Sequence, residues 1–502
     1  MQFPLLAALS TSADALQSTT DPVSQVIVAS VIVAVFALLT RETAHRVLVI
    51  MGAVALLWSI TYFTPYRLIS FEAAKDALDL NVLLLLAGMM AVVGVLKTTG
   101  VFPWAVARLL QRSGGQPRVI QRMVMWFTGV LSAFLDNVTT VIFVTPMASE
   151  MAVRTGIRPV VYLLPMVMAS NIGGTATLIG DPPNVMIGSG AHLSFLEFIR
   201  NLTLPVIFMM VALEWFAARY YRADLKVPAT TTAVTVPGIK DPRLLRWALV
   251  ILAGIFLGFF THTLTGMEVA VPAVIGAALM MIVQDVLYVR RVRPTHSERI
   301  HGLIDIIEKE IEWPTLSFFA FLFIAVGAAV HTGLIDTMAR GLAWTVDNGR
   351  QSFGLSENGT LLFAALLICW ASGFLSALID NIPYVAVAIP LVARLVTQLP
   401  GDTEVLWWAL SLGACLGGNG TAIGASANVT TIGLAERAGI RISFLEFTRF
   451  GASVTALTLL ISSVFLWAHI YFGANRTLLW GLAALAAILA LRTVGRRVSG
   501  KE

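Results

Sequence analysis

The sequence predicts an all-α polytopic membrane protein with about eleven transmembrane helices and two re-entrant hairpins, arranged as inverted-topology repeats with broken helices. Three observations predict it. First, 57% of the 502 residues are hydrophobic and 13% are charged, whereas a soluble domain carries about 25% charged residues. Second, many apolar runs approach the roughly 20 residues that a helix needs to cross a bilayer. Third, the phrase LSAFLDN, which contains Asp136, returns as LSALIDN around Asp380.

The apolar segments that qualify as spans divide the chain into five parts. Residues 1–80 hold an N-terminal segment and the first two spans, 81–218 form a first repeat, and 219–312 contain linker loops and two connecting spans. Residues 313–471 form a second repeat, and 472–502 hold the last span and a basic tail. The spans are centred near residues 31, 55, 89, 168, 209, 253, 277, 323, 414, 461 and 484.

Two further apolar stretches, 119–156 and 357–398, are each too long for one span and are interrupted in the middle by Asp-Asn. We interpret both as re-entrant hairpins. Their aspartates lie 244 residues apart (380 − 136 = 244), and the motifs GGTATLIGDPPNV from Gly173 and GGNGTAIGASANV from Gly417 share this offset. Inverted copies of this kind are typical of alternating-access transporters. We therefore expect the two hairpin tips to meet near the bilayer centre.

The basic residues indicate the topology. The net charge is +5, and Lys and Arg gather in a few loops, such as 219–246 and 290–309, and in the tail. With both hairpins re-entrant, all these clusters fall on the cytoplasmic side of the inner (plasma) membrane, with the N-terminus outside and the C-terminus in the cytoplasm. This clustering is a topology signal and does not indicate nucleic-acid binding. Only Cys369 and Cys415 are present, which excludes a disulfide framework or a multi-cysteine zinc site.

The glycine-rich segments predict breaks in two helices. NIGGTATLIGDPPN, from Asn171 to Asn184, contains three glycines and two adjacent prolines, which remove amide donors and disfavour a continuous helix. A break in a membrane helix persists only where it lines a cavity enclosed by protein, and its open carbonyls and helix ends can bind ions. Close helix packing through small residues is the alternative interpretation. Two aligned breaks rich in Asn and Thr favour a binding site.

The repeated aspartates predict ion coupling. A carboxylate near the bilayer centre costs about 2.5–3.5 kcal/mol on insertion scales, and burial favours its neutral, protonated form unless a partner or cation is present. Such a group can load and release a proton or sodium ion. The alternative is that Asp136 and Asp380 only cap hairpin helices, and both roles are compatible. For Asp181 a role in the turn GDPPN is an equal alternative.

Together the four motifs LSAFLDNVTTVIF, SNIGGTATLIGDPPNV, LSALIDNIP and LGGNGTAIGASANV resemble the ion transporter superfamily, in particular the ArsB/NhaD-type permeases. This group contains arsenite pumps, sodium–proton antiporters and the melanosomal P protein, and the resemblance covers about residues 25–475. It implies two hairpins whose tips meet beside two broken helices, and transport of small anions, of metalloids such as arsenite, or of sodium against protons. The dicarboxylate carriers of the superfamily have Ser-Asn-Thr tips, whereas both tips here are Asp-Asn.

Carried over residue by residue, the resemblance implies ion- or substrate-binding positions in both repeats. No metal ion is implied apart from sodium at Asp136 or Asp380. The positions are Asp136, Asn137, Thr139, Asn171, Gly173, Thr175, Thr177, Asp181 and Asn184 in the first repeat, and Asp380, Asn381, Asn419, Thr421, Ser426 and Asn428 in the second.

The leading hypothesis is an ion-coupled secondary transporter, and not an enzyme, for proton-linked efflux or exchange of a small inorganic ion or an arsenite-type metalloid. It needs no cofactor beyond a coupling proton or sodium ion, its surroundings are lipid, and it is compatible with a homodimer. A sodium–proton antiporter and an anion or dicarboxylate transporter remain alternatives. No GxxxxGK[ST] nucleotide motif occurs, so a primary pump would require an external ATPase subunit. An intramembrane aspartyl protease is disfavoured, because TLIGD lacks the first glycine of GxGD.

Overall fold

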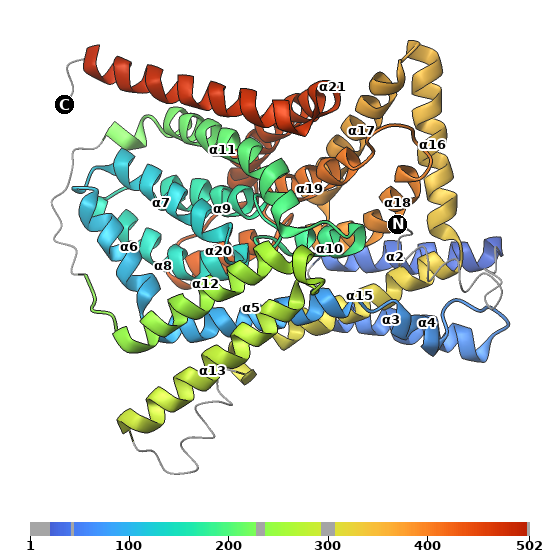
Figure 1. The fold of residues 1–502 in the computed structure, drawn as a ribbon, viewed down its shortest axis with the longest axis horizontal. Coiled ribbons are helices and arrows are strands. Elements are labelled where there is room, and N and C mark those ends of the chain that lie inside the picture. The colour runs from blue at the N-terminus through green and yellow to red at the C-terminus, as the bar shows by residue number, and fades with distance from the viewer. Residues whose placement is uncertain (1–20, 42–44, 227–235, 293–306, 499–502) are drawn as a thin grey trace.

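The computed structural model describes residues 21–41, 45–226, 236–292 and 307–498, and every regular element in these ranges is a helix (Figure 1). Nine of these helices are long and apolar enough to cross a membrane. The prediction of an all-helical, multi-pass membrane protein is therefore confirmed. The nine are α2 (Pro22–Arg41), α3 (Arg46–Phe63), α5 (Leu80–Thr98), α11 (Phe195–Tyr220), α12 (Pro242–Thr265), α13 (Ala270–Val292), α15 (Trp313–His331), α17 (Glu357–Leu378) and α21 (Phe444–Val498).

Two of the predicted spans are short helices that end at a break. α9 (Val160–Gly174) is followed by α10 (Pro182–Ala191), and α19 (Val405–Gly417) is followed by a 3₁₀ turn and then α20 (Ser426–Arg437). Every residue of α9 and α19 is buried, and neither helix contains a charged residue. An uncharged, apolar helix can lie inside the protein without leaving a buried charge uncompensated. The broken helices therefore form the centre of the molecule.

α21 consists of two helices joined at Gly473. This residue has φ = 76° and ψ = 160°, a conformation that glycine adopts without steric cost. The second part, dark red in Figure 1, runs along the outer edge of the molecule. With α21 counted as two helices and with α9 and α19 included, each of the eleven predicted span centres falls on a helix.

The two repeats contain the same order of helices. The first runs from α5 through α6 (Val101–Arg112), α7 (Pro117–Ser132), α8 (Asn137–Thr155) and α9–α10 to α11, and the second from α15 through α16 (Leu334–Phe353), α17, α18 (Asn381–Val396) and α19–α20 to α21. α7 and α8 make the first hairpin, and α17 and α18 make the second. α17 has 22 residues and is long enough to cross a bilayer alone, whereas α7 has 16.

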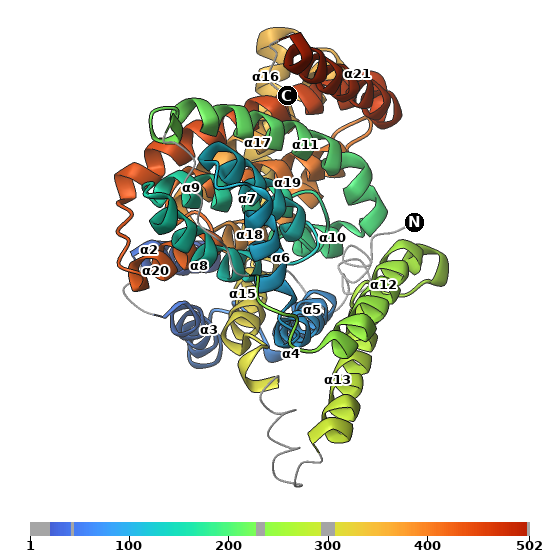
Figure 2. The same cartoon turned by 90° about the vertical axis from the view of Figure 1, so that its left-hand side faces the viewer.

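At the centre, each repeat packs one of its helices against the hairpin of the other repeat. α20 packs against α8, and α10 packs against α18, so the second half of each broken helix contacts the hairpin of the other repeat. α3, α5 and α15 cover one side of this core, and α12 and α13 project at its periphery (Figures 1 and 2). The remaining short elements are α4 (Phe71–Asp76) and the 3₁₀ turns η1 (Asp224–Lys226) and η2 (Gly418–Gly420). This reciprocal packing brings both hairpin tips close to both helix breaks.

Candidate functional site

Both repeated aspartates cap the second helix of their hairpin. Asp136 accepts the Thr139 backbone N–H at 2.8 Å and also accepts the Thr139 hydroxyl in a short hydrogen bond. Asp380 accepts the Ile382 backbone N–H at 3.2 Å. Each carboxylate therefore satisfies amide groups that a helix start would otherwise leave without partners. Asp-Asn therefore recurs where one helix ends and the next begins, and in both copies the second carboxylate oxygen accepts a hydroxyl, that of Thr139 at Asp136 and that of Ser426 at Asp380.

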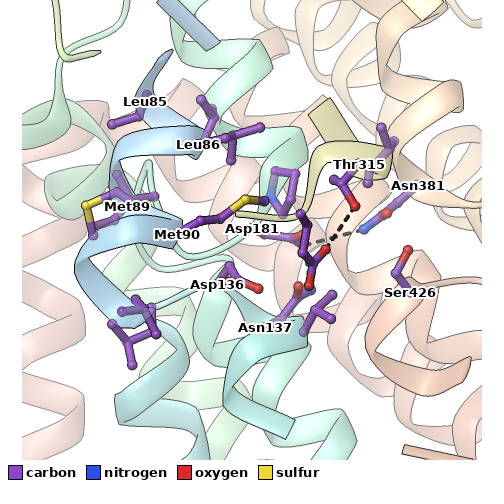
Figure 3. A pocket seen from close by; sticks show the side chains of 18 of the residues that line it. Leu85, Leu86, Met89, Met90, Asp136, Asn137, Asp181, Thr315, Asn381 and Ser426 are labelled. Carbon is purple, nitrogen blue, oxygen red and sulfur yellow. Dashed lines mark hydrogen bonds between the residues drawn. The ribbon is translucent and has the colours of Figure 1, made fainter. Parts of the chain in front are cut away.

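Asp181 connects the two tips. One of its carboxylate oxygens accepts from Asn137 Nδ2 at 3.1 Å, and the other accepts from Asn381 Nδ2 at 3.5 Å. Asp181 precedes α10 but makes no side-chain bond to cap it. Its carboxylate points toward the two tip asparagines (Figure 3). The structure thus brings together tips that are far apart in sequence, as predicted, and it places Asp181 between them and not merely in a turn.

A set of asparagines extends this network into the second repeat. Asn137 Nδ2 also donates to Asn171 Oδ1 at 3.1 Å. Asn171 Nδ2 donates across the repeats to Asn419 Oδ1 at 2.9 Å and Asn428 Oδ1 at 3.0 Å. All four side chains are buried. The Nδ2 of Asn419 has no hydrogen-bond partner among the described residues, so the network ends in an amide donor.

The contacts between the repeats are reciprocal. Asn171 donates to Asn428 at 3.0 Å, and the Cys415 thiol donates to Asn184 Oδ1 at 3.4 Å. Position 415 corresponds to 171, and position 184 corresponds to 428, at the same offset of 244 residues. A contact from i to j matched by one from the copy of i to the copy of j indicates a twofold relation. Around the breaks, the two repeats are therefore related by an approximate twofold axis.

The last asparagine of each glycine-rich motif donates hydrogen bonds to the open carbonyls of its own helix break. Asn184 Nδ2 donates to the carbonyls of Thr175 and Thr177 at 3.1 and 2.9 Å. Asn428 Nδ2 does the same for two carbonyls of the second break, at 2.8 and 2.9 Å. These carbonyls would otherwise lack partners inside the membrane, where an unsatisfied group costs several kcal/mol. Both side chains therefore satisfy the backbone that the break exposes.

Two threonines join the breaks to the hairpins. Thr177 donates its hydroxyl to the carbonyl of Ala133 at 2.5 Å, and Thr421 donates to that of Ala377 at 2.5 Å. Both carbonyls belong to the last turn before a hairpin tip, where the helix leaves them open. Close packing completes the arrangement, because a Cβ at Gly173 would overlap the backbone of Gly129 in α7. These predicted site residues fix the site but do not line its cavity.

A cavity of about 50 Å³ lies where the tips meet. On this measure a water molecule needs roughly 10–15 Å³, so the cavity has room for a small ion or a few water molecules. Its apolar wall comes from α5, including Met89 and Met90 (Figure 3). The predicted site residues that line it are Asp136, Asn137, Asp181, Asn381 and Ser426. The predicted residues outside its lining are Thr139, Asn171, Gly173, Thr175, Thr177, Asn184, Asp380, Asn419, Thr421 and Asn428.

Three further polar residues line this cavity that sequence reasoning did not select. Arg46 begins α3, Glu312 precedes α15, and Thr315 lies in the first turn of α15. In the sequence Arg46 is one of several basic loop residues, and no repeat or motif marks it. A second cavity of about 400 Å³ adjoins the first and shares Arg46, Glu312 and Ser426 with it, while Asp380 lines only this larger one.

The helix ends make the site strongly polar. α8, α10 and α18 each begin after an aspartate, whereas α20 begins after Ala425. Each helix N-terminus is equivalent to about half a positive charge. Three ionised aspartates and Glu312 would exceed the positive charge of four such ends and one arginine. With all four carboxylates ionised, the site would therefore favour a cation or a neutral group over an anion.

Comparison with known proteins shows the family of this chain. Residues 34–413 match the citrate transporter family (CitMHS). The chain belongs to this family. This chain is 36% identical over 449 residues to an uncharacterized transporter of Mycobacterium tuberculosis, and the alignment covers 88% of this chain and 98% of that protein. It is also 30% identical over 537 residues to the human P protein, covering 90% of this chain and 61% of the P protein.

A solved structure has the same fold. The YdaH transporter of Alcanivorax borkumensis aligns with a TM-score of 0.54 and 17% sequence identity, covering 86% of this chain and 99% of that one. The resemblance to the ion transporter superfamily, with the P protein among its relatives, is confirmed. This citrate transporter family member is thus a membrane transporter.

Proposed function

We propose that this protein is an ion-coupled secondary transporter in which a proton or sodium ion binds between Asp136 and Asp181. One observation carries the proposal: two carboxylates and the amides of Asn137 and Asn381 converge on a cavity of about 50 Å³ between two helix breaks. Carboxylate and amide oxygens suit hard cations. A carboxylate surrounded by neutral donors can exchange a proton or a small cation without holding it permanently.

For the transported species we propose a small inorganic ion or a neutral metalloid such as arsenous acid, moved in exchange for protons. The cavity suits a solute of a few atoms, and beside its charged and apolar residues it is lined by two hydroxyls and two amides, those of Thr315, Ser426, Asn137 and Asn381. Sodium–proton antiport uses the same carboxylates and is the closest alternative.

Citrate is the second candidate, because it is the substrate in the family's description. Two features oppose it in this arrangement. Asp136, Asp181 and Glu312, when ionised, would repel its carboxylates, and the space of about 50 Å³ between the tips has room for only a few water molecules. Among the described residues that line the cavity, Arg46 alone has a positively charged side chain.

Transport in proteoliposomes tests these assignments. Purified protein is reconstituted, a pH gradient is imposed, and internal pH is followed while sodium, arsenite, antimonite or citrate is added. We expect one of the first three to change the pH gradient in wild-type vesicles and not in protein-free vesicles. Citrate-dependent proton movement that exceeds all three would replace the proposal, and the absence of movement with every species would refute ion-coupled transport.

We further propose the cell's inner (plasma) membrane as the location, with the N-terminus outside and the C-terminus in the cytoplasm. The loop distribution of Lys and Arg supports this orientation. Fusions of alkaline phosphatase and of a fluorescent protein to each end give the measurement. Activity that places both ends on one side would contradict it.

A further inference from the structure

Arg46, the first residue of α3, lies outside both repeats, but its side chain reaches the second repeat. The guanidinium donates from Nη1 to the Ser426 hydroxyl at 3.1 Å and from Nη2 to the Thr315 hydroxyl at 3.0 Å. It also lies over the ring of Phe318, 5.7 Å from the ring centroid. Two hydrogen bonds and a cation–π contact therefore fix the position of a permanent positive charge.

Each of these hydroxyls is in turn bonded to a carboxylate. Ser426 donates to Asp380 Oδ2 at 3.0 Å, and Thr315 donates to Glu312 Oε2 at 2.9 Å. A hydroxyl can accept one hydrogen bond while it donates another. One guanidinium is thus linked to two carboxylates through neutral groups, and the chain of hydrogen bonds is continuous from Asp380 to Glu312.

This chain of hydrogen bonds lies between the two cavities, because Arg46, Glu312 and Ser426 line both of them. Five titratable groups face Arg46, and one of them is its own neighbour His45, which precedes α3. They are Asp136 and Asp181 in the smaller cavity, Asp380 and His45 in the larger one, and Glu312 in both.

The repeat explains why only the second tip has this link. Ser426 occupies the position that corresponds to Pro182 in the first repeat, and proline has no hydroxyl. Conversely, Asp181 corresponds to Ala425. The described hydrogen bonds to Asp136 and Asp181 come from backbone N–H, hydroxyl and amide groups, all of them neutral. The two tips are therefore chemically unequal, although both begin with Asp-Asn.

We propose that Arg46 is the built-in counter-cation of the second tip, so that the coupling cation binds at the first tip alone. The inference rests on the proposed function. Asp380 and Glu312 share the fixed charge of the guanidinium, which occupies the place that a proton or sodium ion would otherwise take. Among the described hydrogen bonds, none links Arg46 to Asp136 or Asp181, directly or through a hydroxyl, so these two carboxylates depend on a cation from solution. Arg46 acts here as a positioning and specificity-determining residue.

Removal of the guanidinium should turn the second tip into an additional cation site. In Arg46→Gln, the Asp380 carboxylate of the second tip loses its counter-charge, and a half-buried carboxylate without a positive partner favours binding a cation. We expect the Hill coefficient of transport against proton or sodium concentration to rise from about one toward about two. In the double variant Arg46→Gln/Asp380→Asn, the charges of Arg46 and of the second tip are both absent. Glu312 remains half-buried with its hydrogen bond from Thr315, and the coefficient should return to about one.

A matched control and a second measurement separate charge effects from folding effects. Arg41→Gln removes a basic residue at the exposed end of α2, outside both cavities, and should match the wild type. Thermal unfolding in detergent, at rising sodium concentration and at falling pH, reports cation binding without transport, because a cation that binds the native state raises Tm. The Tm of Arg46→Gln should depend more steeply on cation concentration than that of the wild type.

The inference is overturned if Arg46→Gln matches Arg41→Gln in both measurements, or if the double variant keeps the steeper dependence. Should Arg46→Gln not fold, Ser426→Ala cuts the link to Asp380 while it keeps the arginine. It must then show the steeper dependence, and an unchanged one counts against Arg46. Wild-type protein without gradient-driven transport would refute the proposed function instead, and the unfolding measurement would still decide the role of Arg46.

Discussion

Asp181→Asn tests the centre of the site, because one carboxylate joins both hairpin tips. Its two oxygens accept amide hydrogen bonds from Asn137 at 3.1 Å and Asn381 at 3.5 Å. Asparagine at this position keeps the shape but has one acceptor oxygen, so its NH₂ group must face the NH₂ group of one tip. A hydrogen bond to a charged group contributes about 1.5–3 kcal/mol, so we expect transport to fall roughly ten- to hundredfold.

The assay is the initial rate of transport driven by a pH gradient in proteoliposomes, with thermal unfolding in detergent as the measure of folding. Asp79→Asn is the matched control, because Asp79 caps α5 by accepting the Val82 N–H at 3.0 Å and lies outside both cavities. Asparagine caps a helix as well as aspartate does, so this variant should transport like the wild type. A rate for folded Asp181→Asn close to that of Asp79→Asn would refute the reasoning.

Three further predictions test other parts of the arrangement. Asp136→Asn should abolish pH-driven transport, whereas Asp380→Asn should retain part of it, because the proposed coupling cation binds at the first tip. Asparagine preserves both helix caps and deletes only the titratable charge. If neither variant changes transport, these two residues act as helix caps alone. Asn428→Ala removes two hydrogen bonds to break carbonyls and should cost about 2 kcal/mol of stability, seen as a lower Tm, and an unchanged Tm would contradict its role. Gly173→Ala should lower the free energy of unfolding by at least about 1–3 kcal/mol, because the added Cβ overlaps the α7 backbone. Gly433→Ala is the control and should be tolerated, because no atom lies within 4 Å of its added Cβ. Equal melting temperatures of the two variants would contradict this packing argument.

Much of the architecture follows from local sequence. Apolar length places the helices, because each helix satisfies its own backbone in lipid. Glycines place the breaks after α9 and α19, with two prolines added in the first break, and Asp-Asn places the starts of α8 and α18. These residues act on the backbone within a few positions. The repeat is visible because the two copies keep their motifs at one offset. The sequence by itself therefore determined the helix order, the two breaks and the two capped tips.

Only the tertiary structure decided which polar groups face the cavity. Asn184 and Asp181 lie three residues apart in one motif, yet one binds break carbonyls and the other joins the tips. Arg46 reaches Ser426 across 380 residues, and no local pattern connects them. A polar residue beside a broken helix can satisfy either the exposed backbone or a ligand. The choice depends on which helix packs opposite it, and that packing joins residues hundreds of positions apart.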